Sequence, residues 1–379
     1  MAWSWDLLGS LVAVLTLSGL TAGGAIAADA GWEAEWDRTV KAAEREGQVS
    51  VYALSEIGDV FVHSAFQRKF SKIKVNVVSA RGVELVSRIM AERRAEKFLV
   101  DVVSIGNLSP QALYEAKALD AIAPVFILPE VKDESLWWNG KHQMIDAEKR
   151  HIMLFTAAPI YLVAYNKKLA NPSDFKSYWD LLNPKWKGRI AAFDLRSGGF
   201  AGIRDRFFYY NPELGPGFLR RLYGEMNITF YRQYPQGEDW LAAGKFALCL
   251  CRHQSINEAK AQGLPVDLMD PHNFKEGVGV ESRSRSMALM NRAPHPNAAK
   301  VFTNWLLSQE GQEDFQKVSA QYVSSGAAGS LRIDVAKDNI PSANRLLPGA
   351  MYRSEWPELA DIAPVRKLFE EALAQAGTR

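Results

Sequence analysis

Apolar positions in the first half of the chain follow two periods, one typical of strands and one typical of helices. Short runs rich in β-branched residues predict strands at 49–54, 74–79 and 99–104. Between and beside these runs, apolar residues recur at helical spacing. This spacing predicts helices at 36–46 and 60–70, a helix that opens at Gly82 and another that starts at Pro110. Strands that alternate with helices in this way are typical of an open, largely parallel α/β sheet.

A second α/β set follows a break over 124–144, where prolines, paired tryptophans and an Asn-Gly step interrupt the pattern. Strands are predicted at 159–166, 189–194, 246–251, 265–269 and 286–290. Helices are predicted at 178–182, from the turn 196–199 to Tyr210, at 255–262 and at 296–307. About 350 residues exceed what one hydrophobic core usually organises, so we expect two lobes.

Residues 1–27 have the layout of a secretory leader. The stretch 7–27 is uncharged and apolar, and it ends in Ala-Ile-Ala, which is an A-x-A cleavage pattern. We interpret it as a signal peptide that is cleaved before Ala28, which predicts a periplasmic protein. The alternative is a retained membrane anchor, because no Lys or Arg precedes the apolar run and its length is close to what a bilayer requires. No cysteine lies near the cleavage site, which argues against a lipid anchor.

Charge and cysteine content narrow the function classes. The formal net charge of the chain is only +2, which argues against nucleic acid or an anionic membrane surface as the main partner. Cys249 and Cys251 lie two apart in a predicted strand, so their thiols point to one face without good disulfide geometry. They are interpreted as small buried side chains, with a strained redox pair or a soft-metal site as the alternative.

Polar residues follow four of the predicted strands where loops turn into helices. In open α/β sheets, ligands bind at this edge, beside helix N-termini with unpaired N–H groups. The candidate ligand-binding residues at these ends are Ser55, Glu56, Arg81, Gly82, Ser104, Asn107, Arg196, Ser197, Gly198 and Gly199. The turn 196–199 is the sharpest candidate, because its glycines let N–H groups approach an anion and its arginine adds positive charge. The alternative is an ordinary glycine turn with a serine N-cap.

Arg252, His253 and Gln254 follow the cysteine-bearing strand and complete the candidate ligand-binding set. His253 could bind an anion or a metal, whereas the alternative is a helix-capping Gln254 beside a solvated Arg252. The other histidines do not pair at metal-binding spacing, and Tyr209-Tyr210 is interpreted as core, so no metal site and no cofactor is predicted. The chain has no G-x-S-x-G, H-E-x-x-H or G-x-G-x-x-G motif, so we expect a binding protein and not an enzyme.

Short motifs occur in a fixed order along the chain. They read VSVY at 49–52, SARGVELVSRI at 79–89, DVV at 101–103, PKWKGRI at 184–190, SGGF at 197–200 and HPNAAK at 295–300, followed by WL at 305–306 and EGQ at 310–312. As a set, these motifs resemble the family 1 extracellular solute-binding proteins of ABC importers, in particular their ferric-iron-binding branch. The resemblance covers nearly all of the chain after the leader.

The resemblance implies an α/β, two-lobe periplasmic binding protein fold of type II, in which each lobe is a mainly parallel sheet flanked by helices. The ligand would lie in the cleft between the lobes, and a hinge would close it. We expect the chain to cross between lobes near 157–165 and 281–290. Lobe 1 would then comprise 29–156 with 284–320, and lobe 2 would comprise 157–283 with 321–379. The implied partner of this monomer is an ABC permease in the inner membrane.

In the ferric-binding branch, two adjacent tyrosines hold the iron, often with a His and a Glu, and an anion occupies the Ser-Gly turn. By this alignment Arg252 and His253 replace the tyrosines, Glu56 replaces the His and Gly106 replaces the Glu. Ferric iron favours anionic oxygen ligands, so an arginine here suits an anion better. We therefore expect a small anionic solute, namely an organic acid, a sugar phosphate or a phosphonate, held by Arg252, the 197–199 turn and Arg81. The alternatives are ferric iron or an iron chelate as the cargo, and a secreted enzyme or sensor subunit on the same scaffold.

Overall fold

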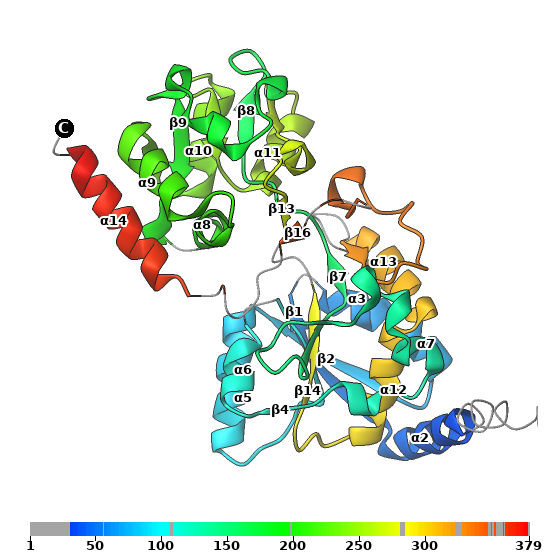
Figure 1. Cartoon of the computed structure of the whole chain (residues 1–379). Helices are drawn as coiled ribbons and strands as arrows, with labels where there is room; N and C mark the ends of the chain where they lie inside the picture. Colours follow the sequence, from blue (N-terminus) through cyan, green and yellow to red (C-terminus); the bar gives the residue numbers. More distant parts are fainter. Residues whose placement is uncertain are drawn as a thin grey trace, which may run out of the picture.

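The computed structural model describes residues 31–55, 57–106, 109–197, 199–280, 285–322, 328–347, 350, 352–353, 359 and 361–377. These residues form two α/β lobes, which Figure 1 shows one above the other. Each lobe has its own core of buried apolar side chains. The predicted leader 1–27 lies outside the described residues. None of the helices in the described ranges has the length and apolar character that crossing a bilayer requires.

The first lobe is built on a seven-stranded sheet. Its strands are β1 (Gln48–Leu54), β2 (Lys74–Ala80), β3 (Val102–Ser104), β4 (Leu119–Asp120), β5 (Gln143–Met144), β6 (Ile152–Leu154) and β14 (Ser286–Met290). The order is β2-β1-β3-β14-β6-β5, and β4 also pairs with β14. β2, β1 and β3 run parallel to one another, so their carboxyl ends lie at one edge of the sheet.

Helices cover this sheet on both faces. They are α2 (Trp32–Glu46), α3 (Gly58–His63), α4 (Phe66–Lys69), α5 (Gly82–Arg94), α6 (Gln111–Glu115), α7 (Pro129–Lys132), α12 (Pro296–Leu307) and α13 (Gln309–Tyr322), with 3-10 turns η1 (Ala123–Val125), η2 (Glu134–Leu136) and η3 (Trp138–Gly140). The single helix predicted at 60–70 is wrong, because the chain is extended at Ser64. The N–H of Ala65 donates instead to the Asp314 carboxylate of α13, over 2.7 Å.

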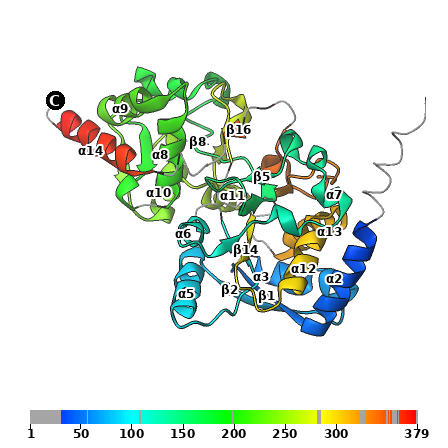
Figure 2. The same cartoon turned by 60° about the horizontal axis from the view of Figure 1, so that its bottom comes forward.

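The second lobe is built on a five-stranded sheet in the order β10-β9-β11-β8-β12. Its strands are β8 (Ala164–Asn166), β9 (Ile190–Phe193), β10 (Thr229–Tyr231), β11 (Leu248–Leu250) and β12 (Val266–Leu268). Its helices are α8 (Phe200–Tyr210), α9 (Gly215–Glu225), α10 (Tyr234–Ala242), α11 (His253–Ala261) and α14 (Ala363–Gly377), with 3-10 turns η4 (Pro172–Asp174), η5 (Tyr178–Leu182), η6 (Pro184–Trp186), η7 (Leu195–Ser197) and η8 (Pro271–Asn273). Figure 2 shows α14 beside α8 and α9 from a second direction.

Both sheets are mixed, which corrects the expectation of mainly parallel sheets. β14 runs antiparallel to β3 and β6, and β8 runs antiparallel to β11 and β12. The reason is the path of the chain, because β14 and β8 are the strands by which it enters each lobe from the other. The candidate ligand-binding loops follow the parallel strands β1, β2 and β3 in the first lobe and β9 and β11 in the second, where β10 is also parallel to β9.

Paired segments connect the lobes. β7 (Thr156–Ala157) pairs with β15 (Gly329–Ser330), and β13 (Val278–Gly279) pairs with β16 (Tyr352–Arg353). The N–H of Ile160 donates to the carbonyl of Gly279 over 2.8 Å. A Cβ at Gly279 would lie 2.5 Å from a methyl carbon of Ile160, so only glycine allows this approach. The sequence predicted two passages between lobes; β16 belongs to a third, through which the chain reaches α14.

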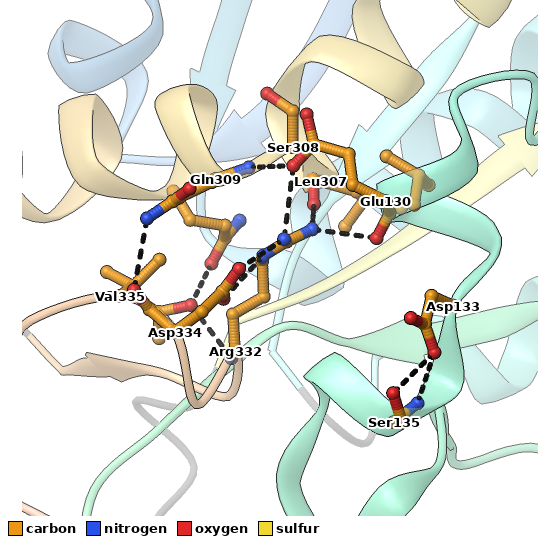
Figure 3. A network of polar contacts seen from close by, with 12 residues as sticks. Glu130, Asp133, Ser135, Leu307, Ser308, Gln309, Arg332, Asp334 and Val335 are labelled. Atoms are coloured by element: carbon orange, nitrogen blue, oxygen red, sulfur yellow. Dashed lines mark hydrogen bonds and ion pairs between the residues drawn. The ribbon is translucent and has the colours of Figure 1, made fainter.

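Arg332 attaches the segment 328–347, which includes the 3-10 turn η9 (Ser342–Asn344), to the first lobe. Its buried guanidinium donates to the carbonyl oxygens of Glu130 and Leu307, over 3.0 Å each, and it pairs with the Asp334 carboxylate (Figure 3). Leu331 lies in the first core, whereas α14 contributes to the second. The prediction assigned all of 321–379 to lobe 2. The segment 328–347 packs on the first lobe instead, whereas α14 packs on the second.

Candidate functional site

Three helices begin at one edge of the second sheet. β9, β10 and β11 are parallel, and each leads directly into α8, α10 or α11. Figure 1 shows α8 on the side of the second lobe nearest to the first lobe. The N-cap residues of the three helices are Gly199, Gln233 and Arg252, and none of these N-termini has a side-chain cap. Their positive dipole ends, and their first-turn N–H groups apart from that of Phe200, are therefore available to an anion.

This geometry bears on both capping alternatives raised by the sequence. Ser197 is exposed and precedes the N-cap residue Gly199, so it does not cap α8. Gln254 lies in the first turn of α11, which starts one residue earlier, at His253. The backbone N–H groups at the starts of α8 and α11 are therefore not capped by Ser197 or by an N-cap glutamine. Gly198 lies outside the described residues.

Arg252 supplies a positive charge at this edge. Its guanidinium carbon lies 4.5 Å from the centre of the Tyr234 ring, and Tyr234 stacks on Phe193 with ring centres 4.3 Å apart. The Arg252 Nε is buried and has no hydrogen-bond partner among the described residues. A guanidinium that is held over an aromatic face keeps its N–H groups for an incoming acceptor.

The Tyr234 hydroxyl also contacts the first residues of α8. The N–H of Phe200 donates to the Tyr234 hydroxyl oxygen over 3.3 Å. Gly199 has φ +58° and ψ −130°, and a Cβ there would lie 2.6 Å from the same hydroxyl oxygen. Glycine is required at this position both for its backbone conformation and for the space that the phenol fills.

Arg204 holds the ends of two strands together, and sequence reasoning missed it. Its buried guanidinium donates to the carbonyl oxygen of Leu250 over 3.0 Å and to that of Phe193 over 3.1 Å. It also forms an ion pair with the Asp205 carboxylate over 2.7 Å, and it donates to the Tyr223 hydroxyl oxygen over 3.1 Å. Burial works against this charge, yet Asp205 raises the pKa of Arg204 above its ordinary value. The sequence signal for it is the charged run Arg204-Asp205-Arg206 inside an otherwise apolar helix.

The Arg196 guanidinium is bound to Asp194 within the turn after β9 and is not left unpaired at the sheet edge. Its guanidinium forms two hydrogen bonds to the buried Asp194 carboxylate, over 2.9 and 2.8 Å, and lies over the Phe369 ring. Burial disfavours the charge of Asp194, but hydrogen bonds from Arg196 and Arg232 hold its pKa below the ordinary value. Asp194 thus offsets part of the charge of Arg196, whereas Arg252 forms no salt bridge with a described residue and has the buried Glu238 as a nearby carboxylate.

Residues of the first lobe stand at the ends of its parallel strands. Ser55 is exposed after β1, and Arg81 is exposed before α5, where it pairs with Glu84. Gly82 is buried, and a Cβ there would lie 2.4 Å from the Ser109 hydroxyl oxygen. The buried Ser104 hydroxyl has no hydrogen-bond partner among the described residues. Glu56 and Asn107 lie outside the described residues.

A cavity of about 370 Å³ lies between the second lobe and the segment 342–347, and α11 contributes Asn257 and Lys260 to its wall. Tyr161 lines it, and the Tyr161 ring centre is 6.3 Å from that of the buried His253. Two carboxylates in its wall have basic partners: Asp267 pairs with Lys260 over 2.7 Å, and Asp270 with His272 over 2.8 Å. The cavity therefore adjoins the Arg252 edge and shares α11 with it.

Side chains of His, Cys, Asp and Glu do not gather into a metal site in the described part of the chain. No group of three or more His, Cys, Asp or Glu there could hold a metal ion. Cys249 and Cys251 are buried free thiols, and the Cys249 sulfur lies 3.5 Å from the Tyr231 hydroxyl. Their burial agrees with the interpretation as small core side chains.

The bacterial extracellular solute-binding protein family matches residues 62–339. The chain belongs to this family. It is thus an extracytoplasmic solute-binding protein of an ABC transporter, as the sequence motifs predicted. The two-lobe fold agrees with this membership.

Relatives and solved structures extend the comparison. Iron uptake protein A1 of Synechocystis is 22% identical over 286 residues, which are 66% of this chain and 75% of that protein. An uncharacterised Haemophilus influenzae protein is 30% identical over 149 residues, 36% of this chain and only 39% of that protein. The fold resembles apo FutA2 of Synechocystis (TM-score 0.63, 16% identity, 86% and 98% of the two chains). It also resembles Trichodesmium FutA in complex with iron and citrate (TM-score 0.59, 20% identity, 88% and 99%).

Proposed function

We propose that this protein captures an anionic iron chelate, in which carboxylates such as those of citrate surround the metal, and delivers it to an ABC permease in the inner membrane. The sequence alone favoured a metal-free anionic solute, with ferric iron or an iron chelate as the alternative cargo. The name of the Synechocystis relative, iron uptake protein A1, supports iron. The iron and citrate bound to Trichodesmium FutA support a carboxylate chelate.

The guanidinium of Arg252 is the observation that carries the proposal. It lies over the Tyr234 ring at the start of α11, and its buried Nε has no hydrogen-bond partner among the described residues. A carboxylate can accept two N–H groups of a guanidinium at once, which gives both strength and orientation. The uncapped starts of α8 and α10 add N–H donors for further carboxylate oxygens.

A bare ferric ion suits this edge poorly. It would face Arg252 and three positive helix ends, and the described residues offer it no cluster of His, Cys, Asp or Glu ligands. In a chelate the carboxylates would face these positive groups and the metal would lie behind them. The remaining proposed contacts are Ser197, Gly198, Gly199, His253 and Gln254 from the second lobe. From the first lobe they are Ser55, Glu56, Arg81, Gly82, Ser104 and Asn107.

A metal-free organic acid, sugar phosphate or phosphonate is the second candidate, since Arg252 would bind its anionic group in the same way. The two candidates differ in whether iron is needed. A thermal-shift panel separates them by comparing ferric citrate, citrate alone, Fe³⁺ with carbonate, a sugar phosphate and a phosphonate.

A ligand at about 100 times its Kd stabilises the folded state by about 2.7 kcal/mol. We expect ferric citrate to raise the unfolding temperature more than citrate does at equal concentration. Equal shifts with and without iron would favour the second candidate. A shift with Fe³⁺ and carbonate but with none of the anions would contradict the role given to Arg252.

A further inference from the structure

Glu238 is a buried carboxyl beside the Arg252 edge. It follows Tyr234 by one turn of α10, so both side chains lie on the same side of the helix. Glu238 is only 5% exposed, and no described residue forms a short, well-aligned hydrogen bond with its carboxyl oxygens, to which the Ser255 hydroxyl makes only a weak contact. Buried polar groups in proteins are nearly always hydrogen-bonded, so a carboxyl in this state needs an explanation.

The surroundings of Glu238 contain one positive group and several that oppose its charge. Arg252 and the Ser255 hydroxyl approach from the start of α11, Asp239 lies next to it on α10, and Tyr231 and Cys251 face it from the core. Burial is the largest effect and raises the pKa of Glu238 to about 7, although Ser255 and Arg252 favour the charged form. Glu238 therefore changes charge near neutral pH.

We propose that Glu238 is a specificity-determining residue of the anion site, because it competes electrostatically with the bound anion for Arg252. Without ligand, the ionised carboxylate partly compensates the guanidinium. When an anion binds Arg252, the two negative charges repel each other in a medium of low dielectric constant. A proton from the solvent then binds a Glu238 oxygen, so anion binding and proton uptake are coupled.

This inference rests on the proposed function, since it assumes that Arg252 binds the anionic part of the cargo. It goes beyond it by predicting how affinity changes with pH. Oxalate is a suitable probe, because it is a dicarboxylate whose charge stays constant near neutral pH. If the bound state requires a protonated Glu238 with a pKa of about 7, oxalate binding should weaken about 30-fold between about pH 6 and about pH 8.5.

The experiment is isothermal titration calorimetry of oxalate at both pH values, in two buffers of different ionisation enthalpy. The wild type should take up close to one proton per oxalate at about pH 8.5 and only about a tenth of a proton at about pH 6. Glu238→Gln keeps the shape of the side chain but not its charge, so its affinity should be nearly independent of pH. Asp239→Asn is the matched control, because it removes the exposed carboxylate next along α10 and leaves Glu238 in place; the pH dependence should remain and should only move to slightly lower pH, since Asp239 raises the pKa of Glu238.

Wild-type binding without pH dependence or proton uptake would overturn the inference, as would a Glu238→Gln variant that keeps the wild-type profile. The proton-uptake measurement uses the wild type alone, so it decides the matter even if Glu238→Gln fails to fold. An absence of oxalate binding at either pH would also overturn the inference. A parallel titration with ferric citrate then shows whether the proposed function fails as well.

Discussion

Replacing Arg204 with methionine removes the guanidinium that joins the ends of β9 and β11. The substitution leaves the carbonyl oxygens of Phe193 and Leu250 without the Arg204 donor, and it leaves the buried Asp205 carboxylate without its positive partner, with the Tyr223 hydroxyl still donating to it. Removing one partner of a buried ion pair typically costs about 3–5 kcal/mol. Because the loops that carry Arg252 and Gly199 follow these strand ends, we also expect weaker cargo binding by the variant that remains folded.

Thermal unfolding followed by circular dichroism measures the effect. A domain of this size loses about 2–4 °C in melting temperature per kcal/mol, so Arg204→Met should lower it by about 6–20 °C. Arg221→Met is the control, because its exposed pair with Glu225 on α9 contributes only about 0.3–0.5 kcal/mol. Arg204→Met/Asp205→Asn should recover part of the loss, since the uncompensated charge is gone. If Arg204→Met melts together with Arg221→Met, Arg204 does not hold the strand ends in the way described.

Three further substitutions test separate parts of the structure. Gly199→Ala should cost about 1–3 kcal/mol and weaken anion binding, because a side chain is strained at φ +58° and meets the Tyr234 hydroxyl; unchanged melting and affinity would contradict this conformation. Arg332→Met should detach the segment 328–347, lower the free energy of unfolding by about 3–5 kcal/mol and speed amide hydrogen exchange in this segment. Exchange as slow as in the Arg221→Met control would contradict this role of Arg332. Burial lowers the pKa of Lys337 to about 8, so between about pH 8 and 10.5 the unfolded chain binds more protons, and wild-type stability should rise with pH relative to Lys337→Met; parallel stability curves would exclude this effect.

Local signals predicted the elements whose boundaries depend on few distant contacts. The strand at 286–290 and the helix at 296–307 are confirmed to the residue. The apolar run 287–290 after Ser286 defines the strand, and a proline at the first helical position defines the start of the helix. The helix predicted at 60–70 failed for the opposite reason, because Asp314, far along the chain, binds the N–H of Ala65.

The sequence located the candidate site only through the strand-to-helix junctions that it predicted. Arg252 is at the predicted strand-to-helix junction, but nothing near it in sequence indicates that Tyr234 supports its guanidinium. Arg196 carries an equal sequence signal, yet Asp194 two residues earlier holds its charge. Which arginine keeps unsatisfied N–H groups is a property of tertiary packing, and sequence spacing does not encode it.

Titration of ferric citrate into the wild type, Arg252→Gln and the control Arg221→Gln tests the central claim most directly. The wild type and the control should bind with the same Kd. Arg252→Gln should lose about 2–5 kcal/mol of binding free energy, since a buried, charge-paired contact is removed. An Arg252→Gln variant that binds ferric citrate as tightly as the wild type would contradict the account.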